Sequence, residues 1–456
     1  MTDTAYHLVG VGGIGMSAIA RLLLARGAHV SGSDVKRTAL TDELAAEGVR
    51  IAIGHAAANG ASADVVVVSS AIADDNPELR TARERGQRVV LRGAMLAELA
   101  RDHTLVAVAG THGKTTTTAM LATIFETAGL DPTVSVGGIR VDSGTNARAG
   151  ASTWFVTESD ESDGSFLELR PAIAVITNIE NDHVTSEDGV ARMRAQFDAF
   201  AETVLREGQL TIGVDDAAAA ALARRSRGRV TTFATRATAQ LSAVDVRYAD
   251  LGSRFTVPGV GDVALNVPGE INVQNALGAL AAALAAGIAF ADVARALAAF
   301  HGVQRRFEIV GRGALTVVDD YAHHPTAIAR TIAAARTVAN GAPVVVAFQP
   351  HRYTRTQFLR HEFVAALAAA DHVFLAPVYA ASERPIPGVT ERSIGTPLAA
   401  SGTPVAYVDD VEALPEAILR DAPPGALVLM LGAGSISTVA HALGRRVAAT
   451  PVTLSS

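Results

Sequence analysis

Cysteine is absent from the 456 residues of this sequence. The absence excludes disulfide bonds, thiolate metal sites and a cysteine nucleophile. Positive charge is not in excess either. The formal net charge is −7, so we expect neither a broad nucleic-acid-binding surface nor one for anionic membranes. Local basic loops can still bind small anions.

Long apolar runs are also missing. The N-terminus lacks the basic and apolar regions of a signal peptide. The longest uncharged apolar stretch, residues 276–291, is shorter than the roughly 20 residues that a membrane span needs. We therefore expect a buried core helix there, no membrane insertion and a cytoplasmic protein. The 49% of hydrophobic residues is enough to form a core in each of several domains.

Three segments begin alike, with a short apolar strand, a loop and then a helix. They start at His7, Thr104 and Ala314. Strands that alternate with helices predict α/β domains with parallel sheets. We place the domains at residues 1–101, 102–304 and 305–456. Within the second, residues 208–267 resemble short β pieces, and alanine-rich helices follow up to Phe300.

The first glycine cluster, Gly10-x-Gly12-x-x-Gly15, follows a strand and precedes a helix. Such glycines let the backbone approach a diphosphate, which then lies on the helix N-terminus. Asp34 ends the next strand, where an acid that binds a ribose is found. The pattern fits a nucleotide, an NAD-dependent dehydrogenase among others, or a tight turn without a ligand.

The second cluster contains Gly110, Gly113, Lys114 and Thr115, again between a strand and a helix. Backbone N–H groups can hold phosphate oxygens there, the lysine can reach the β- and γ-phosphates, and the threonine can ligate Mg²⁺. Val108 replaces the first glycine of the full P-loop pattern. Because a simple dehydrogenase needs one phosphate loop, two such loops favour an enzyme that combines a nucleotide-linked substrate with ATP chemistry.

An acidic segment follows a later strand. Two like charges about 4 Å apart repel by about 4 kcal/mol at an effective dielectric of about 20, so such a cluster must be solvated, spread apart or neutralised by a cation. We expect at least one Mg²⁺ ligand among its four acids, and Asn178 and His183 follow a neighbouring strand at the same sheet edge. The acids are Glu158, Asp160, Glu161 and Asp163.

The third segment carries arginines that suit carboxylates and phosphates. Arg352 and Arg355 come after a strand, and Arg305 and Arg306 lie at a presumed hinge. Surface arginines at helix starts are the alternative. Further polar contacts are expected from His323, His324, His351 and Tyr353.

Taken in order, these motifs resemble the Mur ligase family of peptidoglycan synthesis over essentially the whole chain. The matching segments are GVGGIGMSAIA, GTHGKTTTTAM, ESDESDGSF, NIENDH, FHGVQRRFE, DDYAHHPT and QPHRYTRT. The resemblance implies an N-terminal Rossmann-like domain for UDP-N-acetylmuramate, a central P-loop ATPase-type domain and a C-terminal Rossmann-like domain for the amino acid.

The implied activity is an ADP-forming ligase that uses ATP and Mg²⁺ to join L-alanine to UDP-N-acetylmuramate through an acyl phosphate. The implied partners are these small molecules, and the implied state is a monomer or homodimer. Lys114, His323, Arg352 and Arg355 would be catalytic. Mg²⁺ would be held by Thr115, Glu158 and His183.

The resemblance also implies two sets of binding residues. ATP would contact Gly110, Thr111, His112, Gly113, Lys114, Thr115, Thr116, Asn275, Arg306 and Asp320. The substrates would contact Gly12, Gly13, Ile14, Gly15, Asp34, Ser69, Ser70, His112, Tyr321, His323, Arg352 and Arg355.

Two positions depart from the family pattern. Ile271 stands where a histidine that helps to bind adenine is usual, and Ser435 where an aspartate is usual. No lysine follows His183 nearby, in keeping with the alanine-adding members, which lack a carbamylated lysine. The open alternatives are a murein-recycling ligase that attaches a peptide, an NAD-dependent oxidoreductase, and a nucleotide-dependent binding protein without catalysis.

Overall fold

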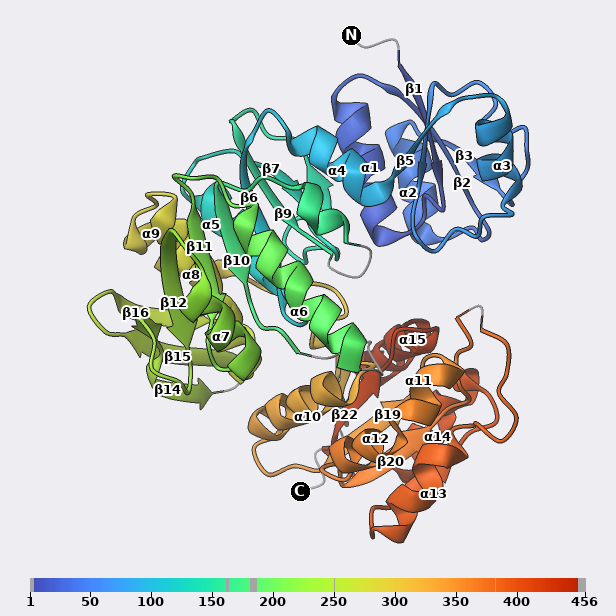
Figure 1. The fold of residues 1–456 in the computed structure, drawn as a ribbon. Helices are drawn as coiled ribbons and strands as arrows, with labels where there is room; N and C mark the ends of the chain where they lie inside the picture. The colour runs from blue at the N-terminus through green and yellow to red at the C-terminus, as the bar shows by residue number, and fades with distance from the viewer. Residues whose placement is uncertain (1–3, 161–163, 181–186, 250, 382, 450–456) are drawn as a thin grey trace. The chain divides into compact units, whose positions relative to one another are not determined.

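The computed structural model describes residues 4–160, 164–180, 187–249, 251–381 and 383–449. Two compact units divide the chain. The first runs to Val244 and also contains Val257–Asp262 and Gln274–Phe300, and the second contains the remainder. Three large sheets form where the sequence predicts three α/β segments (Figure 1). The predicted fold class is confirmed.

The N-terminal segment forms a five-stranded parallel sheet of order β3-β2-β1-β4-β5. Its strands are β1 (Ala5–Val9), β2 (His29–Asp34), β3 (Arg50–Ile53), β4 (Val65–Val68) and β5 (Arg88–Leu91). The helices are α1 (Ile14–Ala25), α2 (Ala39–Glu47), α3 (Pro77–Glu84) and α4 (Arg92–Ala100). The strand order changes direction beside β1, at β4, which is where ligands bind in such sheets.

Local sequence explains these elements. The four valines of β4 are all buried, as β-branched residues are in the middle of a parallel sheet. Thr38 and Thr41 form a capping box at the start of α2, and Gly48 ends that helix with a left-handed φ of 109°. Asn76 caps α3, with Pro77 in its first turn.

The central segment forms an eight-stranded sheet of order β13-β12-β11-β10-β6-β9-β7-β8. Its strands are β6 (Thr104–Ala109), β7 (Thr133–Ser135), β8 (Ala147–Arg148), β9 (Trp154–Glu158), β10 (Ile173–Ile176), β11 (Gln209–Gly213), β12 (Arg229–Ala234) and β13 (Leu241–Ser242). Its helices are α5 (Lys114–Thr127), η1 (Ser165–Glu168), α6 (Glu187–Glu202), α7 (Ala217–Arg225), α8 (Glu270–Ala285) and α9 (Phe290–Ala299). A three-stranded sheet contains β14 (Val244–Ala249), β15 (Gly252–Val257) and β16 (Gly261–Leu265).

One expectation for this segment is incomplete. Residues 208–267 do form short strands, but the helix α7 lies among them. Asp216 caps α7 by accepting hydrogen bonds from Ala218 and Ala219, and a run of alanine follows, which is the best helix former. Residues 276–285 of the apolar stretch 276–291 lie in the predicted core helix, where Leu277 and Leu280 of α8 are fully buried. The rest of the stretch leaves α8 and enters α9 at Phe290. Within the described residues, no helix combines the length and apolarity that a membrane crossing requires.

The C-terminal segment forms a six-stranded sheet of order β17-β18-β22-β19-β20-β21, parallel except for β17. Its strands are β17 (Glu308–Arg312), β18 (Thr316–Asp320), β19 (Val344–Phe348), β20 (His372–Leu375), β21 (Val405–Tyr407) and β22 (Leu427–Leu431). Its helices are α10 (Pro325–Ala339), α11 (Tyr353–Phe358), α12 (Arg360–Leu367), α13 (Arg392–Ala400), η2 (Val411–Ala413), α14 (Leu414–Asp421) and α15 (Ile436–Ala449). Alternate residues of β19 enter two separate apolar clusters, so helices cover both faces of the sheet.

A single apolar core crosses the predicted boundary at residue 101. Leu8, Leu22 and Leu99 of the N-terminal segment belong to the same buried cluster as Phe155 and Phe166 of the central segment. Helix α1 packs on β8, and α4 packs on η1. The first two sheets are therefore parts of one compact unit, although the predicted domain boundaries themselves stay predictions.

A buried carboxylate, that of Glu78, contacts strands β1 and β2 of the N-terminal sheet. Glu78, whose side chain is fully buried, accepts hydrogen bonds from Ser33 Oγ at 2.6 Å and Asn59 Nδ2 at 2.6 Å, and lies 3.2 Å from His7 Nε2. Burial alone would raise the pKa of Glu78. The contacts with His7, Ser33 and Asn59 outweigh burial and lower it to about 2.

This network predicts an acid-dependent loss of stability. The pKa of Glu78 is lower in the folded than in the unfolded chain, so its contribution is present above pH 4.5 and is lost as the pH falls toward 2. The difference corresponds to about 3 kcal/mol of unfolding free energy. Urea unfolding of the first unit, followed between pH 6 and pH 2.5, should show this loss in the wild type and much less of it in Glu78→Gln.

Glu84 is the matched control, because it is an exposed glutamate on the same helix. Glu84→Gln should keep the wild-type pH dependence. An unchanged pH dependence in Glu78→Gln would contradict the assignment of the acid-sensitive step to Glu78.

Candidate functional site

The carboxyl ends of three parallel strands meet at one edge of the central sheet. β6 lies between β9 and β10, with Val108 paired to Glu158 and Ala109 paired to Ile176. The loop after β6 therefore starts beside the end of β9 and the residues that follow β10. This is the edge at which α/β proteins bind ligands, and the predicted neighbours Lys114, Glu158 and Asn178 all come from it.

The loop 110–113 is braced by the residues that follow β10. Asn178 Oδ1 accepts a hydrogen bond from His112 N at 2.9 Å, and Asn178 Nδ2 donates to His112 O at 3.0 Å. Thr177 Oγ1 donates to His112 O at 2.6 Å. A Cβ on Gly110, whose φ is +130°, would lie 2.0 Å from Thr177 Oγ1. The glycine is thus required both by its conformation and by this close approach.

Helix α5 begins with the predicted phosphate-binding residues. Lys114 Nζ donates hydrogen bonds to the carbonyl groups of Gly110 and Thr111 in its own loop. Thr115 and Thr116 are buried in the first turn. Gly113, with a φ of +84°, precedes them and has no side chain that could cap the helix. The helix start therefore combines a positive end of the helix dipole with a lysine ammonium, which suits an anion.

Thr115 and Glu158 form an oxygen-rich group beside the loop. Thr115 Oγ1 donates to Glu158 Oε2 at 2.8 Å. The carboxylate lies so close to Gly137 that a Cβ there would be 1.5 Å from Glu158 Oε1. A hydroxyl and a carboxylate are hard oxygen ligands of the kind that Mg²⁺ prefers. The arrangement fits the predicted Mg²⁺ site, while the third predicted ligand, His183, lies outside the described residues.

Asn275 lies directly against the phosphate loop. It is a buried residue in α8, and a Cβ on Gly113 would be 2.2 Å from its Oδ1. Its predicted contact with adenine stays a prediction.

An acidic side chain borders the phosphate loop on the β10 side, because His112 Nε2 lies 3.5 Å from Glu180 Oε2.

One acid of the predicted acidic cluster has a cationic partner in the N-terminal segment. Asp160 Oδ2 accepts a hydrogen bond from Arg92 Nη2 at 3.0 Å. The same arginine packs on the first glycine cluster, since a Cβ on Gly15 would lie 3.0 Å from Arg92 Nη1. Charge repulsion at Asp160 is thus relieved by an arginine. Glu161 and Asp163 lie outside the described residues.

The first glycine cluster joins β1 to α1, as predicted. Asp34 Oδ2 accepts a hydrogen bond from Gly12 N at 2.9 Å, and a Cβ on Gly12 would lie 2.8 Å from that oxygen. Gly13 is the N-cap of α1, which begins at Ile14. Because Val9 of β1 pairs with Val68 of β4, Ser69 and Ser70 follow at the same sheet edge. The structure therefore brings these predicted substrate residues together.

The C-terminal sheet gathers its predicted residues at its own carboxyl edge. Arg355 Nη1 donates to His351 Nδ1 at 3.2 Å, and the rings of His351 and His323 lie 5.7 Å apart. Tyr379 stacks on His351 at 5.6 Å. Burial, with the positive charges of Arg355 and Arg352, lowers the pKa of His351 to about 4. His351 is therefore neutral at pH 7.

Arg352 adopts an uncommon conformation beside these rings. Its φ is +71°, which is left-handed, and its N–H donates to Tyr379 O at 2.8 Å. Such a backbone is costly for a residue with a Cβ and persists only where neighbouring contacts hold it.

Ser435, one of the two departures from the family pattern, also has a defined contact: its Oγ lies 3.2 Å from Gln349 Nε2, which donates to it. The contact gives no reason for serine in place of aspartate, since a carboxylate could accept from the same amide.

The predicted hinge residues surround Tyr321. The guanidinium carbons of Arg305 and Arg306 lie 4.8 and 5.1 Å from its ring centroid. Asp320 accepts hydrogen bonds from Phe307 N and Ala322 N, both at 2.7 Å. Burial raises the pKa of Asp320, and the charge of Arg306 acts against this rise. Asp320 therefore holds the hinge segment, and its contact with ATP stays a prediction.

One group of three acidic and histidine side chains in the described residues could also be considered for a metal. It consists of Glu308, Asp319 and His441. Ser437 Oγ donates to Asp319 Oδ2 at 2.5 Å, and Arg305 Nε lies 4.0 Å from that same oxygen. Burial raises the pKa of Asp319, and these two neighbours counteract it. A guanidinium at this distance competes with a cation, so we interpret the group as an ion-pair network.

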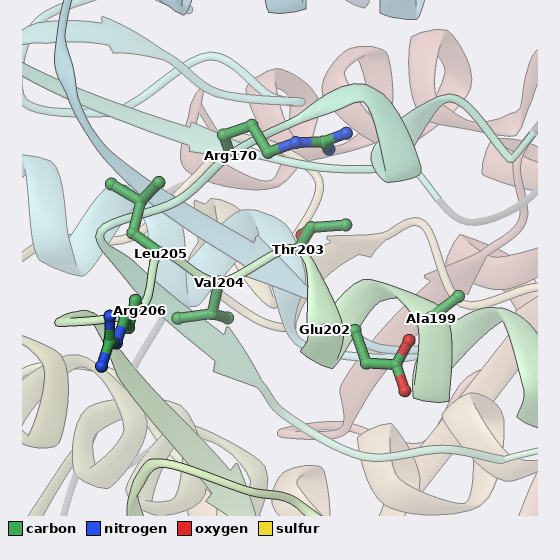
Figure 2. Close-up of a pocket in the computed structure, with 7 residues that line it drawn as sticks. All are labelled: Arg170, Ala199, Glu202, Thr203, Val204, Leu205 and Arg206. Atoms are coloured by element: carbon green, nitrogen blue, oxygen red, sulfur yellow. The ribbon is translucent and has the colours of Figure 1, made fainter.

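A surface hollow of about 370 Å³ lies elsewhere on the first unit (Figure 2). It is formed by Arg170 and the residues at the end of α6 and just beyond it. The lining residues are Arg170, Ala199, Glu202, Thr203, Val204, Leu205 and Arg206. None of them belongs to the predicted site, so the hollow is not the phosphate site.

Sequence reasoning missed Gly137, Arg92 and Tyr379 as neighbours of the site. Gly137 follows a short strand in a Val-Gly-Gly sequence, which signals a close backbone approach without saying to what. Arg92 and Tyr379 carry no local signal. Their partners are distant in sequence, and only the folded chain brings them together.

Three family models match the chain. Residues 5–104 match "Mur ligase family, catalytic domain", residues 108–283 match "Mur ligase middle domain", and residues 305–434 match "Mur ligase, glutamate ligase domain". Among curated relatives, a UDP-N-acetylmuramate–L-alanine ligase of Acidithiobacillus ferrooxidans is 47% identical over 95% of this chain and 96% of its own length. One of Desulforapulum autotrophicum is 44% identical over 97% and 99%.

Solved structures agree with this match. The UDP-N-acetylmuramate-alanine ligase of Thermotoga maritima superposes with a TM-score of 0.84 at 30% identity, covering 97% of this chain and 99% of its own. A murein peptide ligase of Psychrobacter arcticus gives a TM-score of 0.74 at 23% identity, covering 98% and 99%. At 23% identity, this second comparison shows a shared fold.

The close approach of Gly137 to Glu158 gives a testable prediction. In Gly137→Ala the new methyl group would displace the carboxylate, so we expect divalent-cation affinity to fall by about 10-fold or more. Mn²⁺ binding followed by electron paramagnetic resonance measures this. Gly129→Ala is the control: its φ of +73° strains an alanine, but a Cβ there would meet no atom within 4 Å, so the variant should lose stability and keep its cation affinity. Equal affinities in both variants would contradict the assignment.

Proposed function

The chain belongs to the Mur ligase family, and from that premise we propose that it is an ATP-dependent ligase joining L-alanine to UDP-N-acetylmuramate. The support is a near full-length likeness to relatives that carry this activity in their names. The chain also keeps the group of Lys114, Thr115 and Glu158 at one sheet edge. Such an enzyme acts in peptidoglycan precursor synthesis, and we place it in the cytoplasm.

The first glycine cluster would bind the diphosphate of the sugar nucleotide. The start of α1 presents backbone N–H groups and the positive end of a helix dipole. Asp34 accepts a hydrogen bond from Gly12 N and thereby fixes the conformation of the loop. The same carboxylate would also contact the ribose of the sugar nucleotide. Ser69 and Ser70 at the end of β4 would add hydroxyl contacts at the same edge.

The second loop would bind the phosphates of ATP. To reach them, Lys114 must exchange its hydrogen bonds to the carbonyl groups of Gly110 and Thr111 for phosphate oxygens. Thr115 and Glu158 would hold Mg²⁺, which when bound neutralises phosphate charge. Asn178 and Thr177 keep the loop in place, so that little reorganisation is needed during the reaction.

The reaction consists of two transfers. A carboxylate oxygen of the muramoyl group forms a bond to the γ-phosphorus while the bond to the bridging oxygen breaks and ADP leaves. The amine of L-alanine then bonds to the acyl carbon, the bond to the phosphate oxygen breaks, and the amine loses a proton. Positioning and charge neutralisation provide most of the rate in such chemistry.

The C-terminal residues would bind the amino acid. Arg352 and Arg355 carry the positive charge that suits its carboxylate. Arg355 donates to His351 Nδ1, so neutral His351 carries its proton on Nε2. His323 has the reverse tautomer. Its Nδ1 lies 2.8 Å from Tyr321 O, and because a carbonyl oxygen can only accept, Nδ1 carries the proton. Its Nε2 is the nitrogen able to take a proton, which makes His323 our candidate for the acceptor.

Release of inorganic phosphate tests the proposal. We expect release from ATP and Mg²⁺ only when UDP-N-acetylmuramate and L-alanine are both present. A tripeptide in place of L-alanine tests the murein-recycling alternative, and a change in NADH absorbance tests the oxidoreductase alternative. Equal phosphate release with and without L-alanine would overturn the proposal.

Lys114 supports a second prediction. Lys114→Ala should reduce turnover by about 100-fold or more while leaving the unfolding midpoint nearly unchanged. The sequence has only two lysines, and the other, Lys36, is exposed. Mass spectrometry after amine labelling should therefore show that ATP protects Lys114 and leaves Lys36 reactive. Near wild-type turnover in Lys114→Ala would contradict the proposal that Lys114 binds the phosphates of ATP.

A further inference from the structure

Asn146 links the central segment to the start of α1. It is fully buried between β7 and β8, just before β8 begins. Its Nδ2 donates hydrogen bonds to Ile14 O at 2.6 Å and to Ser17 Oγ at 3.0 Å. Both acceptors lie in the first turn of α1, the turn that follows the first glycine cluster.

The other end of the Asn146 amide is also engaged. Its Oδ1 accepts a hydrogen bond from Arg21 Nη1 at 2.5 Å, one turn further along α1. Arg21 is itself nearly buried and donates to Glu47 and Glu43 of α2. A single amide from the central segment therefore bonds directly to α1 and is linked to α2 through Arg21.

These contacts differ from ordinary core packing. A buried amide whose donors are paired costs little. Without it, Ile14 O keeps the hydrogen bond from Ser17 Oγ, and Arg21 keeps its bonds to Glu43 and Glu47, but both lose their link to the central segment. The apolar core already joins α1 to β8 and would hold the segments together without any polar contact. What the amide adds is direction, because hydrogen bonds fix the angle and the axial position of the helix start.

We propose that Asn146 is a positioning residue, which sets the place of the diphosphate loop relative to the phosphate loop at 110–113. This inference rests on the proposed function, in which the first loop holds the sugar nucleotide and the second holds ATP. Both loops lie in the first compact unit. The muramoyl carboxylate must meet the γ-phosphate, and an error of about 1 Å in such an approach can cost up to about 100-fold in rate.

The kinetic test compares two variants at this position. Asn146→Leu removes every hydrogen bond of the amide. Asn146→Asp keeps an acceptor for Arg21 but cannot donate to Ile14 O. If Asn146 positions α1 through Ile14, kcat falls about 10-fold or more in both variants, while the Kd of each nucleotide changes less than about 2-fold. If Asn146 merely anchors Arg21, Asn146→Asp keeps the wild-type kcat, and the proposal is wrong.

Asn59→Leu is the matched control. Asn59 also uses its amide in hydrogen bonds, to Gly54 O and Glu78, but these remain inside the N-terminal segment. The variant should lose stability without losing kcat per folded molecule. An equal fall of kcat in Asn59→Leu would show that any loosening of the N-terminal segment suffices, which overturns a special role for Asn146.

A second readout does not depend on the activity. Hydrogen–deuterium exchange should quicken together in peptides covering residues 14–25 and 133–148 of Asn146→Leu, and not in Asn59→Leu. Unchanged exchange in both peptides would reject the positioning role even if the wild type proved not to use L-alanine. Conversely, an inactive wild type with the expected exchange would reject the proposed function alone.

Discussion

The parallel pairing of β6 with β9 and β10 is the constraint on which the candidate site depends. Its register places Glu158 opposite Val108 and brings Thr177 and Asn178 beside the loop that follows β6. Once those strands pair, a glycine loop, a carboxylate and an amide must share one edge. Lysine and threonine at the start of α5 then face an environment that suits phosphate and a hard cation. The chemistry is thus a consequence of strand register.

The loops are held more firmly than glycine-rich sequences suggest. Thr177 and Asn178 fix His112 from one side, and Asp34 fixes Gly12 in the first cluster. In both loops a polar side chain at or just beyond the end of a neighbouring strand accepts a hydrogen bond from the N–H of a loop residue. Glycine provides the close approach, and the bracing side chain removes the freedom that glycine would otherwise bring.

Local sequence patterns predicted the parts of the site that depend on short spacing. The turns at Gly10–Gly15 and Gly110–Thr115, and their positions at strand ends, follow from glycine chemistry and the α/β rule. The contacts of Arg92 with Asp160 and of Asn146 with Ile14 join residues 68 and 132 positions apart, and no periodicity encodes them. The expectation of short β pieces over residues 208–267 leaves out helix α7, whose signals are local: the cap at Asp216 and the alanine run.

The apolar core shared by the first two sheets bears on how such proteins can be recombined. A cut near residue 101, shortly before the first family model ends at 104 and the second begins at 108, looks natural in sequence. Yet it would divide one buried cluster, expose the faces of α1 and α4, and leave Asn146 without its acceptors. A graft of the N-terminal sheet into another scaffold must therefore bring the strands β7 and β8 with it. The unit that can be exchanged between proteins is therefore larger than the N-terminal domain delimited by the family model, which ends at residue 104.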